Sequence, residues 1–269
     1  MAQAAGIVLA GGKSSRMGSP KAALEWHGST LLRRVTGIVA RSVDGPVVVV
    51  SAPGQELPAL DPAVEVVADE REGRGPVQGI AAGLAAIGSR AEVAYVSATD
   101  VPLLHPAFIR RVVSAVDGFD VALPDVGGYR QPLSAAYRVA LVGALRELLA
   151  GDGTSHGSLF ERSRVRHMSA DDLLEDPTLA RLDPALLSVS NLNEPVEYER
   201  AHALPAPDIV VEVGSRRQRV GAWSLGRAAV AAGVTLDKHV VAALNGDQIV
   251  CDPELPLVPG DMLAFMVVG

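Results

Sequence analysis

Residues 5–10 form an uninterrupted apolar run that ends directly at two glycines, Gly11 and Gly12. A short apolar run broken by glycine is typical of a buried strand that leaves the core through a tight loop. This loop carries three cations, Lys13, Arg16 and Lys21. Because backbone N–H groups of glycine-rich loops approach phosphate oxygens closely and cations offset the phosphate charge, the pattern predicts a nucleotide-binding loop.

Two well-known phosphate-binding motifs do not fit this loop. The tripeptide Gly12-Lys13-Ser14 matches the end of the G-x-x-x-x-G-K-[ST] pattern, but that pattern needs glycine at the position of Ile7. The G-x-G-x-x-G fingerprint of dinucleotide-binding folds also fails, because the two glycines are adjacent here. A plain turn between a strand and a helix stays open as an alternative, although it leaves the three cations unexplained.

The chain that follows alternates between strand-like and helix-like segments. Strands are expected at residues 5–10, 46–51, 64–68, 93–98 and 120–124, and helices at residues 30–42, 76–87, 106–116 and 139–150. The strands are short and rich in valine, which is typical of strands buried on both faces. The alternation predicts an α/β fold, a Rossmann-like and mostly parallel sheet with helices on both faces. Ligands of such sheets bind at the carboxyl ends of the strands.

The pattern changes after Leu204-Pro205-Ala206-Pro207, which is typical of a short, stiff linker. Beyond it, strands are expected at residues 208–213, 217–221, 240–244 and 262–268, with a helix at residues 224–232. Two strands, a helix and further strands follow the order of the β-grasp fold. We therefore expect an α/β domain with the nucleotide-binding loop over residues 1–204 and a small β-grasp domain over residues 208–269. Another small β-rich domain is the alternative.

Composition limits the possible classes of function. The 269 residues are 48% hydrophobic, which is enough for a substantial core, and the formal net charge of −7 argues against nucleic acid as a partner. No apolar run is long enough for a membrane span and no signal-peptide pattern is present, so we expect no membrane association. Cys251 is the single cysteine, which excludes intrachain disulfides and favours a cytoplasmic location.

Two positions outside the loop suggest chemistry by themselves. Asp100 follows the expected strand at residues 93–98, where a carboxylate suits a Mg²⁺ ion that bridges nucleotide phosphates. Capping of the helix near residue 106 is the simpler alternative for Asp100. Gly75 and Gly79 flank the start of a helix, where the lack of side chains lets a flat base approach the backbone.

The stretch at residues 9–21, L-A-G-G-x-S-x-R-M-G-x-x-K, resembles the opening motif of nucleotidyltransferases that make molybdenum cofactor guanine dinucleotide. Sugar-phosphate nucleotidyltransferases carry a looser version. Asp100-Val101-Pro102 fits the family's Asp-x-Pro motif, and Asn191-Leu192-Asn193-Glu194-Pro195 resembles its Asn-x-Asn-x-Pro motif. One region departs from the pattern. Residues 151–158 lack the basic side chains that the family often has there, and Arg130 and Arg138 are candidates to compensate.

The resemblance implies roles for individual residues. Catalysis would rest on Arg16, Lys21 and Asp100, and Mg²⁺ would be held by Asp100 and Asn193. Asp69 would contact the nucleotide, with a solvated loop acid as the alternative. For the Asn191–Asn193 stretch, the alternative is plain capping of the following helix by Asn193 or Glu194. Guanine is implied by Gly79. The implied nucleotide-binding residues are Leu9, Ala10, Gly11, Gly12, Lys13, Lys21, Asp69, Gly75, Gly79 and Asp100.

The expected function is therefore Mg²⁺-dependent transfer of GMP from GTP to the phosphate of molybdopterin, with release of pyrophosphate. Transfer to another phosphate monoester is one alternative. Another follows from the C-terminal segment, which resembles ubiquitin-like sulfur carriers such as the small subunit of molybdopterin synthase, on residues 243–246, 259–261 and Gly269. The chain would then be a sulfur carrier with a degenerate nucleotide-binding domain. Val268 stands where sulfur carriers have a second glycine, so we expect this domain to recruit a molybdoenzyme or a cofactor-biosynthesis protein, or to stabilise the enzyme.

Overall fold

The computed structural model describes residues 3–11, 20–69, 75–151 and 156–267 of the chain. These residues divide into two compact units. Unit 1 comprises Met1–Leu24 and Thr30–Asn193, and unit 2 comprises Glu25–Ser29 and Glu194–Gly269. The division assigns a short N-terminal segment to the C-terminal unit. The boundary at residue 204 stays a prediction.

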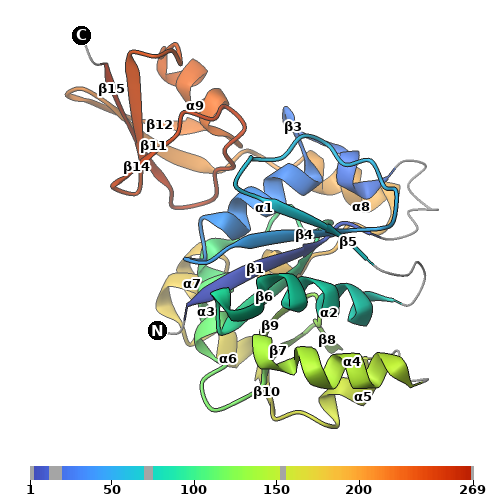
Figure 1. Ribbon diagram of the computed structural model, residues 1–269. Helices are drawn as coiled ribbons and strands as arrows, with labels where there is room; N and C mark the ends of the chain where they lie inside the picture. Colours follow the sequence, from blue (N-terminus) through green and yellow to red (C-terminus); the bar gives the residue numbers. More distant parts are fainter. Residues whose placement is uncertain (1–2, 12–19, 70–74, 152–155, 268–269) are drawn as a thin grey trace. The chain divides into compact units, whose positions relative to one another are not determined.

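Unit 1 is built on an eight-stranded sheet with the order β10-β7-β9-β6-β1-β4-β5, and β8 pairs with β7 (Figure 1). Its strands are β1 (Ala4–Leu9), β4 (Val47–Ser51), β5 (Glu65–Ala68), β6 (Val93–Ala98), β7 (Val121–Val126), β8 (Tyr129–Arg130), β9 (Ser134–Arg138) and β10 (Val165–Ser169). The neighbours β6, β1, β4 and β5 are parallel, and so are β7 and β10. The predicted mostly parallel α/β architecture is confirmed.

Helices cover both faces of this sheet (Figure 1). One face carries α2 and α4, and the other carries α1, α3 and α6. The helices of unit 1 are α1 (Leu31–Ala40), α2 (Pro76–Ile87), α3 (Pro106–Ser114), α4 (Val142–Ala150), α5 (His156–Phe160), α6 (Ala170–Leu174) and α7 (Pro177–Leu182). The α2 face is closely packed, because a Cβ at Gly83 would lie 2.7 Å from Ile7 Cγ2. Helix α2 therefore packs directly on β1, at a distance that leaves no room for a side chain at Gly83.

The sheet differs from the sequence-based expectation in its number of strands and in the burial of one of them. Strands β8, β9 and β10 were not predicted, and β9 runs antiparallel between β6 and β7. Strand β5 was expected to be buried on both faces, but it is the edge strand and most of its residues are exposed. Its valines and alanine match a buried pattern, yet a strand at the end of a sheet has only one neighbour to cover it.

Unit 2 contains a five-stranded sheet with the order β12-β11-β15-β13-β14. Its elements are α8 (Pro195–His202), β11 (Asp208–Val213), β12 (Arg216–Gly221), α9 (Leu225–Ala232), β13 (Val240–Leu244), β14 (Asp247–Ile249) and β15 (Met262–Val267). Strands β11 and β15 are parallel, and the other pairs are antiparallel. Ser224 caps α9 by accepting a hydrogen bond from the Arg227 N–H, and Leu225, Leu263 and Phe265 belong to a separate core.

Candidate functional site

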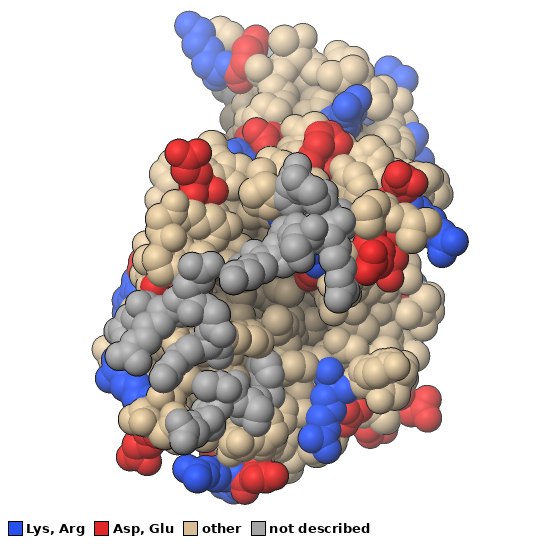
Figure 2. Space-filling view, turned by 90° about the vertical axis from the view of Figure 1, so that its right-hand side faces the viewer, with Lys and Arg blue, Asp and Glu red and all other residues tan. Residues whose placement is uncertain are grey.

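A pocket of about 590 Å³ opens at the carboxyl ends of β1, β4 and β6 in unit 1. Figure 2 looks onto this face, where the surface is hollowed. The pocket contains eight of the predicted nucleotide-binding residues, namely Leu9, Ala10, Gly11, Lys21, Asp69, Gly75, Gly79 and Asp100. The sequence spreads these residues over more than ninety positions, and the parallel sheet brings them to one edge.

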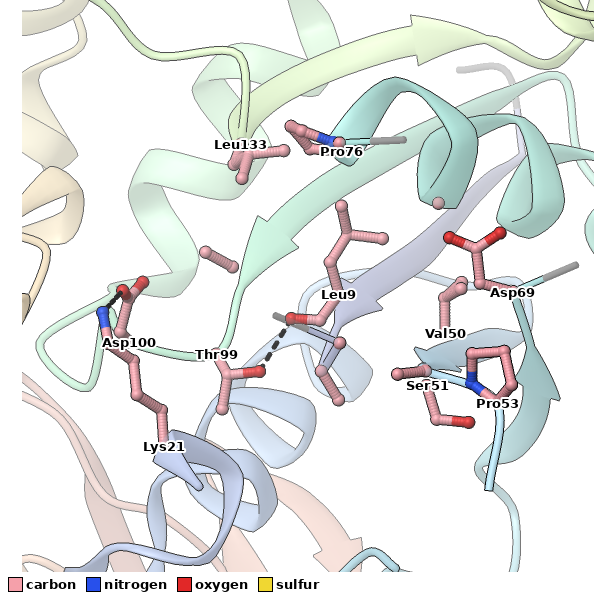
Figure 3. A pocket seen from close by; sticks show the side chains of 16 residues that line it. Leu9, Lys21, Val50, Ser51, Pro53, Asp69, Pro76, Thr99, Asp100 and Leu133 are labelled. Atoms are coloured by element: carbon pink, nitrogen blue, oxygen red, sulfur yellow. Dashed lines mark hydrogen bonds and ion pairs between the residues drawn. The ribbon is translucent and has the colours of Figure 1, made fainter. Parts of the chain in front are cut away.

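One end of the pocket holds a cation and a carboxylate (Figure 3). Lys21 Nζ lies 2.6 Å from Asp100 Oδ2 and donates a second hydrogen bond, of 2.9 Å, to Asn193 Oδ1. Both charged side chains are largely buried, with 21% and 14% of their surfaces exposed. Predicted residues from three distant segments thus meet around one ammonium group. Such a pair would stay ordered while exposing its charges to a phosphate chain.

The backbone around Asp100 is fixed by neighbouring segments. Its carbonyl accepts a 2.9 Å hydrogen bond from the Leu192 N–H, which ties the Asn191–Asn193 stretch to the end of β6. The buried side chain of Arg34 donates from Nε to the Pro102 carbonyl at 2.6 Å. Asp100 does not cap α3, because His105 occupies that position and accepts from the Ala107 N–H. The capping alternative for Asp100 is therefore wrong.

Asn193 is also not a helix cap. Glu194 is the N-cap residue of α8, and its N–H donates to the Glu197 carboxylate at 3.0 Å. The Asn193 side chain instead accepts from Lys21. The Lys21 ammonium group thus binds both Asn193 and the Asp100 carboxylate. Asn193 therefore lies close enough to Asp100 to take part in the site.

The opposite end of the pocket carries Asp69 (Figure 3). Its N–H donates to the Ser51 carbonyl at 2.8 Å, which continues the pairing of β5 with β4. Its Oδ1 accepts a short hydrogen bond from Gln78 Nε2, and Gln78 is buried on α2. Asp69 is thus an oriented carboxylate in a pocket rather than a loop acid surrounded by water.

Gln78 and Gln55 were not predicted from the sequence. Gln55 Oε1 accepts from the Ala52 N–H at 2.9 Å, and its Nε2 donates to the Ala10 carbonyl at 3.0 Å. The amide therefore joins the segments after β1 and β4, whose residues Ala10 and Ala52 line the pocket. Gln78 lies between Gly75 and Gly79, in the stretch expected to contact the base, but only the two glycines were assigned a role there. Gln55 lies in no motif that the sequence displays.

The two glycines of α2 serve different purposes. Gly75 has φ 77° and ψ 179°, a conformation open essentially only to glycine, and it directly precedes the helix. At Gly79, a Cβ would lie 3.1 Å from Leu9 Cδ2. Gly79 therefore allows α2 to approach the end of β1, in addition to any contact with a base.

We expect Gly75→Ala to lower the free energy of unfolding by roughly 1–3 kcal/mol, because an added Cβ opposes this backbone conformation. Thermal unfolding followed by circular dichroism measures the effect. Gly143→Ala is the matched control, since Gly143 lies in α4 with open space around it. Equal stability of the two variants would contradict the assignment of strain to Gly75.

Three of the predicted residues, Gly12, Lys13 and Arg16, lie outside the described residues. Of the two arginines considered as compensating cations, Arg138 is excluded by its place in the sheet. It pairs with Val93 at the amino end of β6, so it lies at the edge opposite the pocket. Arg130 pairs with Asp125 near the carboxyl end of β7, so it lies at the pocket edge.

The donor set fits a divalent cation shared with substrate. Asp100 Oδ1 is buried and has no hydrogen-bond partner among the described residues, whereas Oδ2 faces Lys21. Those residues contain no group of three or more His, Cys, Asp or Glu side chains that could by itself hold a metal ion. Mg²⁺ is commonly held by one or two carboxylates together with substrate phosphates and water, so a single well-placed aspartate suits it.

Comparisons with known proteins identify the family. A model of the MobA-like NTP transferase domain matches residues 6–167. The chain belongs to this family. A protein of Pelotomaculum thermopropionicum named "Probable molybdenum cofactor guanylyltransferase" is 33% identical over 204 residues, which cover 76% of this chain and 94% of that protein. A protein of the same name from Mycobacterium avium is 39% identical over 171 residues, covering 62% of this chain and 85% of that protein.

A solved structure supports the same fold for the MobA-like chain. Molybdopterin-guanine dinucleotide biosynthesis protein A from Archaeoglobus fulgidus superimposes with a TM-score of 0.58 at 22% identity, over 74% of this chain and 96% of that one. The chain is thus a nucleotidyltransferase, and its pocket lies where the fold is expected to bind nucleotide. In the described part of the chain, no helix is long and apolar enough to cross a membrane.

Proposed function

We propose that this MobA-like protein transfers GMP from GTP to the terminal phosphate of molybdopterin and releases pyrophosphate, with Mg²⁺ as cofactor. The observation that carries the proposal is a single pocket with Lys21, Asp100 and Asn193 around one end and Asp69 at the other. A nucleotide has the same polarity, with anionic phosphates at one end and a hydrogen-bonding base at the other. The names of the relatives from Pelotomaculum and Mycobacterium support GTP as the donor.

The proposed chemistry needs no general base. A phosphate monoester is already an anion at neutral pH, so it can attack the α-phosphorus of GTP directly, and pyrophosphate leaves from the opposite side. Catalysis then rests on alignment and on neutralisation of charge. Lys21 would contact the phosphates with its ammonium group, and Arg34 and Leu192 would keep the backbone of Asp100 in place. Bound at Asp100, with Asn193 beside it, Mg²⁺ would supply charge stabilisation to the phosphate oxygens.

Guanine would be bound at the Asp69 end. Guanine offers N–H donors on its Watson–Crick edge, and a carboxylate fixed by Gln78 is a matching acceptor. Gly75 and Gly79 would let the ring lie against the backbone. The pocket walls beside them are mostly apolar, with Leu9, Val50 and Pro53 among the residues that a base would contact.

We expect GTP to bind more tightly than CTP or ATP, with each lost hydrogen bond costing roughly 1–3 kcal/mol. Calorimetric titration of the full chain with the three nucleotides measures this. Gln78→Leu should narrow the preference, because Asp69 loses the group that orients it, while the exposed Gln248→Leu change should leave the preference intact. Equal affinities for the three nucleotides in the wild-type protein would rule out base selection at Asp69.

The C-terminal part of unit 2 is proposed to be a β-grasp domain. Support comes from its strand order, in which the first and last strands, β11 and β15, are parallel and adjacent, and from the single helix α9 between the hairpin and the remaining strands. Gly269 lies outside the described residues, and we propose that the domain recruits a molybdoenzyme or a cofactor-biosynthesis protein, or stabilises the enzyme. We propose a cytoplasmic location because the chain has a single cysteine.

One assay separates the proposed function from its alternatives. The protein is incubated with Mg²⁺, molybdopterin and each of GTP, CTP and ATP, and release of pyrophosphate is followed with and without a chelator. Release with GTP and molybdopterin, lost on chelation, is the expected result. Release only with another phosphate monoester would favour that acceptor. No release with any acceptor, together with a gain of sulfur at Gly269 after treatment with an activating enzyme, ATP and a sulfur donor, would favour the sulfur carrier.

A further inference from the structure

Unit 2 contains a cluster of aromatic side chains that joins three separate parts of the chain. Trp26 comes from the hairpin of β2 (Glu25–Trp26) and β3 (Ser29–Thr30), and only 1% of its surface is exposed. Its indole meets the rings of His202 and Trp223 edge-on, each at 5.6 Å between centroids, and that of Tyr198 at 6.3 Å. Tyr198 and His202 belong to α8, and Trp223 directly precedes Ser224, the cap of α9.

His27 fixes the tip of the hairpin in this cluster. Its imidazole stacks on His202 at 4.1 Å and on Trp223 at 4.8 Å, with interplanar angles of 17° and 9°. The backbone of His27 has φ 49°, a left-handed conformation that is unfavourable for a residue with a side chain. The stacking therefore stabilises a hairpin conformation that the sequence alone would not favour.

Polar contacts tie the same hairpin to both α8 and the loop before β15. The Tyr198 hydroxyl donates to the Glu25 carbonyl at 2.5 Å, and His202 Nε2 lies 2.9 Å from Glu25 Oε2. Ser29 Oγ donates to Glu254 Oε2 at 2.7 Å. Four side chains of the C-terminal part of the chain thus hold the hairpin: Tyr198, His202, Trp223 and Glu254.

Chain connectivity links this cluster to the pocket. The η1 turn (Lys21–Ala23) is followed by Leu24 and then by Glu25, the first residue of the hairpin. Asn193 is followed directly by Glu194, the N-cap of α8. Lys21 and Asn193, which are hydrogen-bonded to each other beside Asp100, thus lie close in sequence to the two segments that the aromatic cluster joins: Lys21 is four residues before Glu25, and Asn193 directly precedes Glu194.

We infer that the aromatic cluster positions residues for nucleotidyl transfer. By joining the hairpin to α8, it constrains the two chain segments that carry Lys21 and Asn193, and through these side chains it determines the geometry around Asp100. Trp223, His27 and His202 are positioning residues, and the C-terminal part of unit 2 acts on catalysis through them. The inference rests on the transferase activity of the family and not on the identity of the base or acceptor. Because coupling between two sites is reciprocal, occupation of the pocket must in turn affect the cluster.

The chain provides its own reporter, since its two tryptophans, Trp26 and Trp223, both belong to the cluster. We expect the tryptophan emission of the full chain to change on titration with Mg²⁺ and GTP, CTP or ATP, in step with binding measured by calorimetry. Without any nucleotide, Lys21→Met should also change the emission, whereas the exposed Lys238→Met change should not.

The second arm is kinetic. Trp223→Ala should lower kcat on the order of fivefold to tenfold, with the KM for nucleotide changed less than about twofold, because the Asp69 end of the pocket is not affected. Trp223→Phe, which keeps a ring for stacking, should restore most of kcat. The control is Phe265→Leu, which weakens the separate core of unit 2 without touching the cluster. Equal losses of kcat in Trp223→Ala and Phe265→Leu would show that the lower kcat reflects a general loss of stability, and would overturn the inference.

The two proposals fail in different ways. If the wild-type protein releases no pyrophosphate with molybdopterin and GTP, the proposed function fails, and the emission of Lys21→Met still decides the inference. If Lys21→Met has wild-type emission and any nucleotide that binds leaves the tryptophans unchanged, the cluster does not communicate with the pocket and the inference is wrong.

Discussion

Replacement of Asp100 by alanine is expected to abolish nucleotidyl transfer while leaving the protein folded. Asp100 combines a carboxylate oxygen beside Lys21 with a buried oxygen that has no partner among the described residues, which is the group that a bridging cation would use. Loss of a metal ligand removes several kcal/mol of transition-state stabilisation, or a factor of about 10³ or more in kcat. Pyrophosphate release under saturating GTP and Mg²⁺ measures it.

The control for this change is Asp61→Ala, because Asp61 is an exposed loop acid that caps its own turn through the Ala63 N–H. Asp100→Asn adds a finer test. It keeps the shape of the side chain and an oxygen, so the fold and the Leu192 contact to the backbone should survive while the charge is lost. Near-normal turnover in a folded Asp100→Ala protein would show that the carboxylate is not needed for the reaction.

The second large effect is expected at Lys21. Lys21→Met keeps the length of the side chain and removes the ammonium group that lies between Asp100 and Asn193. Groups that neutralise charge developing in the transition state typically contribute on the order of 10²–10³ in kcat. We expect a loss of this size in kcat, because the negative charge of the phosphates would then meet Asp100 without an opposing cation.

Lys238→Met, an exposed lysine in unit 2, is the matched control for Lys21→Met. Since Lys21 also neutralises Asp100, the variant should bind Mg²⁺ at least as well as the wild-type protein, even though turnover falls. A Lys21→Met protein with weakened Mg²⁺ binding and unchanged kcat would contradict the assignment of Lys21 to the phosphates.

The strands and helices of unit 1 were largely predictable because their pattern is local. Short valine-rich runs such as residues 47–51 and the proline at the start of α2 and α3 leave few alternatives. Strand β9 was missed because its sequence, Ser134–Arg138, holds two alanines and no valine, and because its pairing with β6 and β7 is antiparallel within an alternating α/β chain. No local pattern indicates such an insertion.

The candidate site was predictable where a motif or a strand end carried it, as at Asp100 and Lys21. Gln78, Gln55 and Arg34 were not, because each acts by a hydrogen bond to a residue that is remote in the sequence: Asp69, Ala10 and Pro102. The membership of Glu25–Ser29 in unit 2 was likewise invisible, since Trp26 and His27 acquire their partners only through the fold. Side chains that orient other side chains follow no fixed spacing in the sequence, so no sequence motif reveals them.

The edges of the eight-stranded sheet have a consequence for association between copies of the chain. The outermost strands, β5 and β10, are four and five residues long, and they carry charged or ionisable side chains at Glu65, Arg166 and His167. Short edge strands with charged side chains are poor templates for intermolecular β-pairing. The large sheet that builds the pocket is thus not expected to pair, at β5 or β10, with a strand of a second molecule.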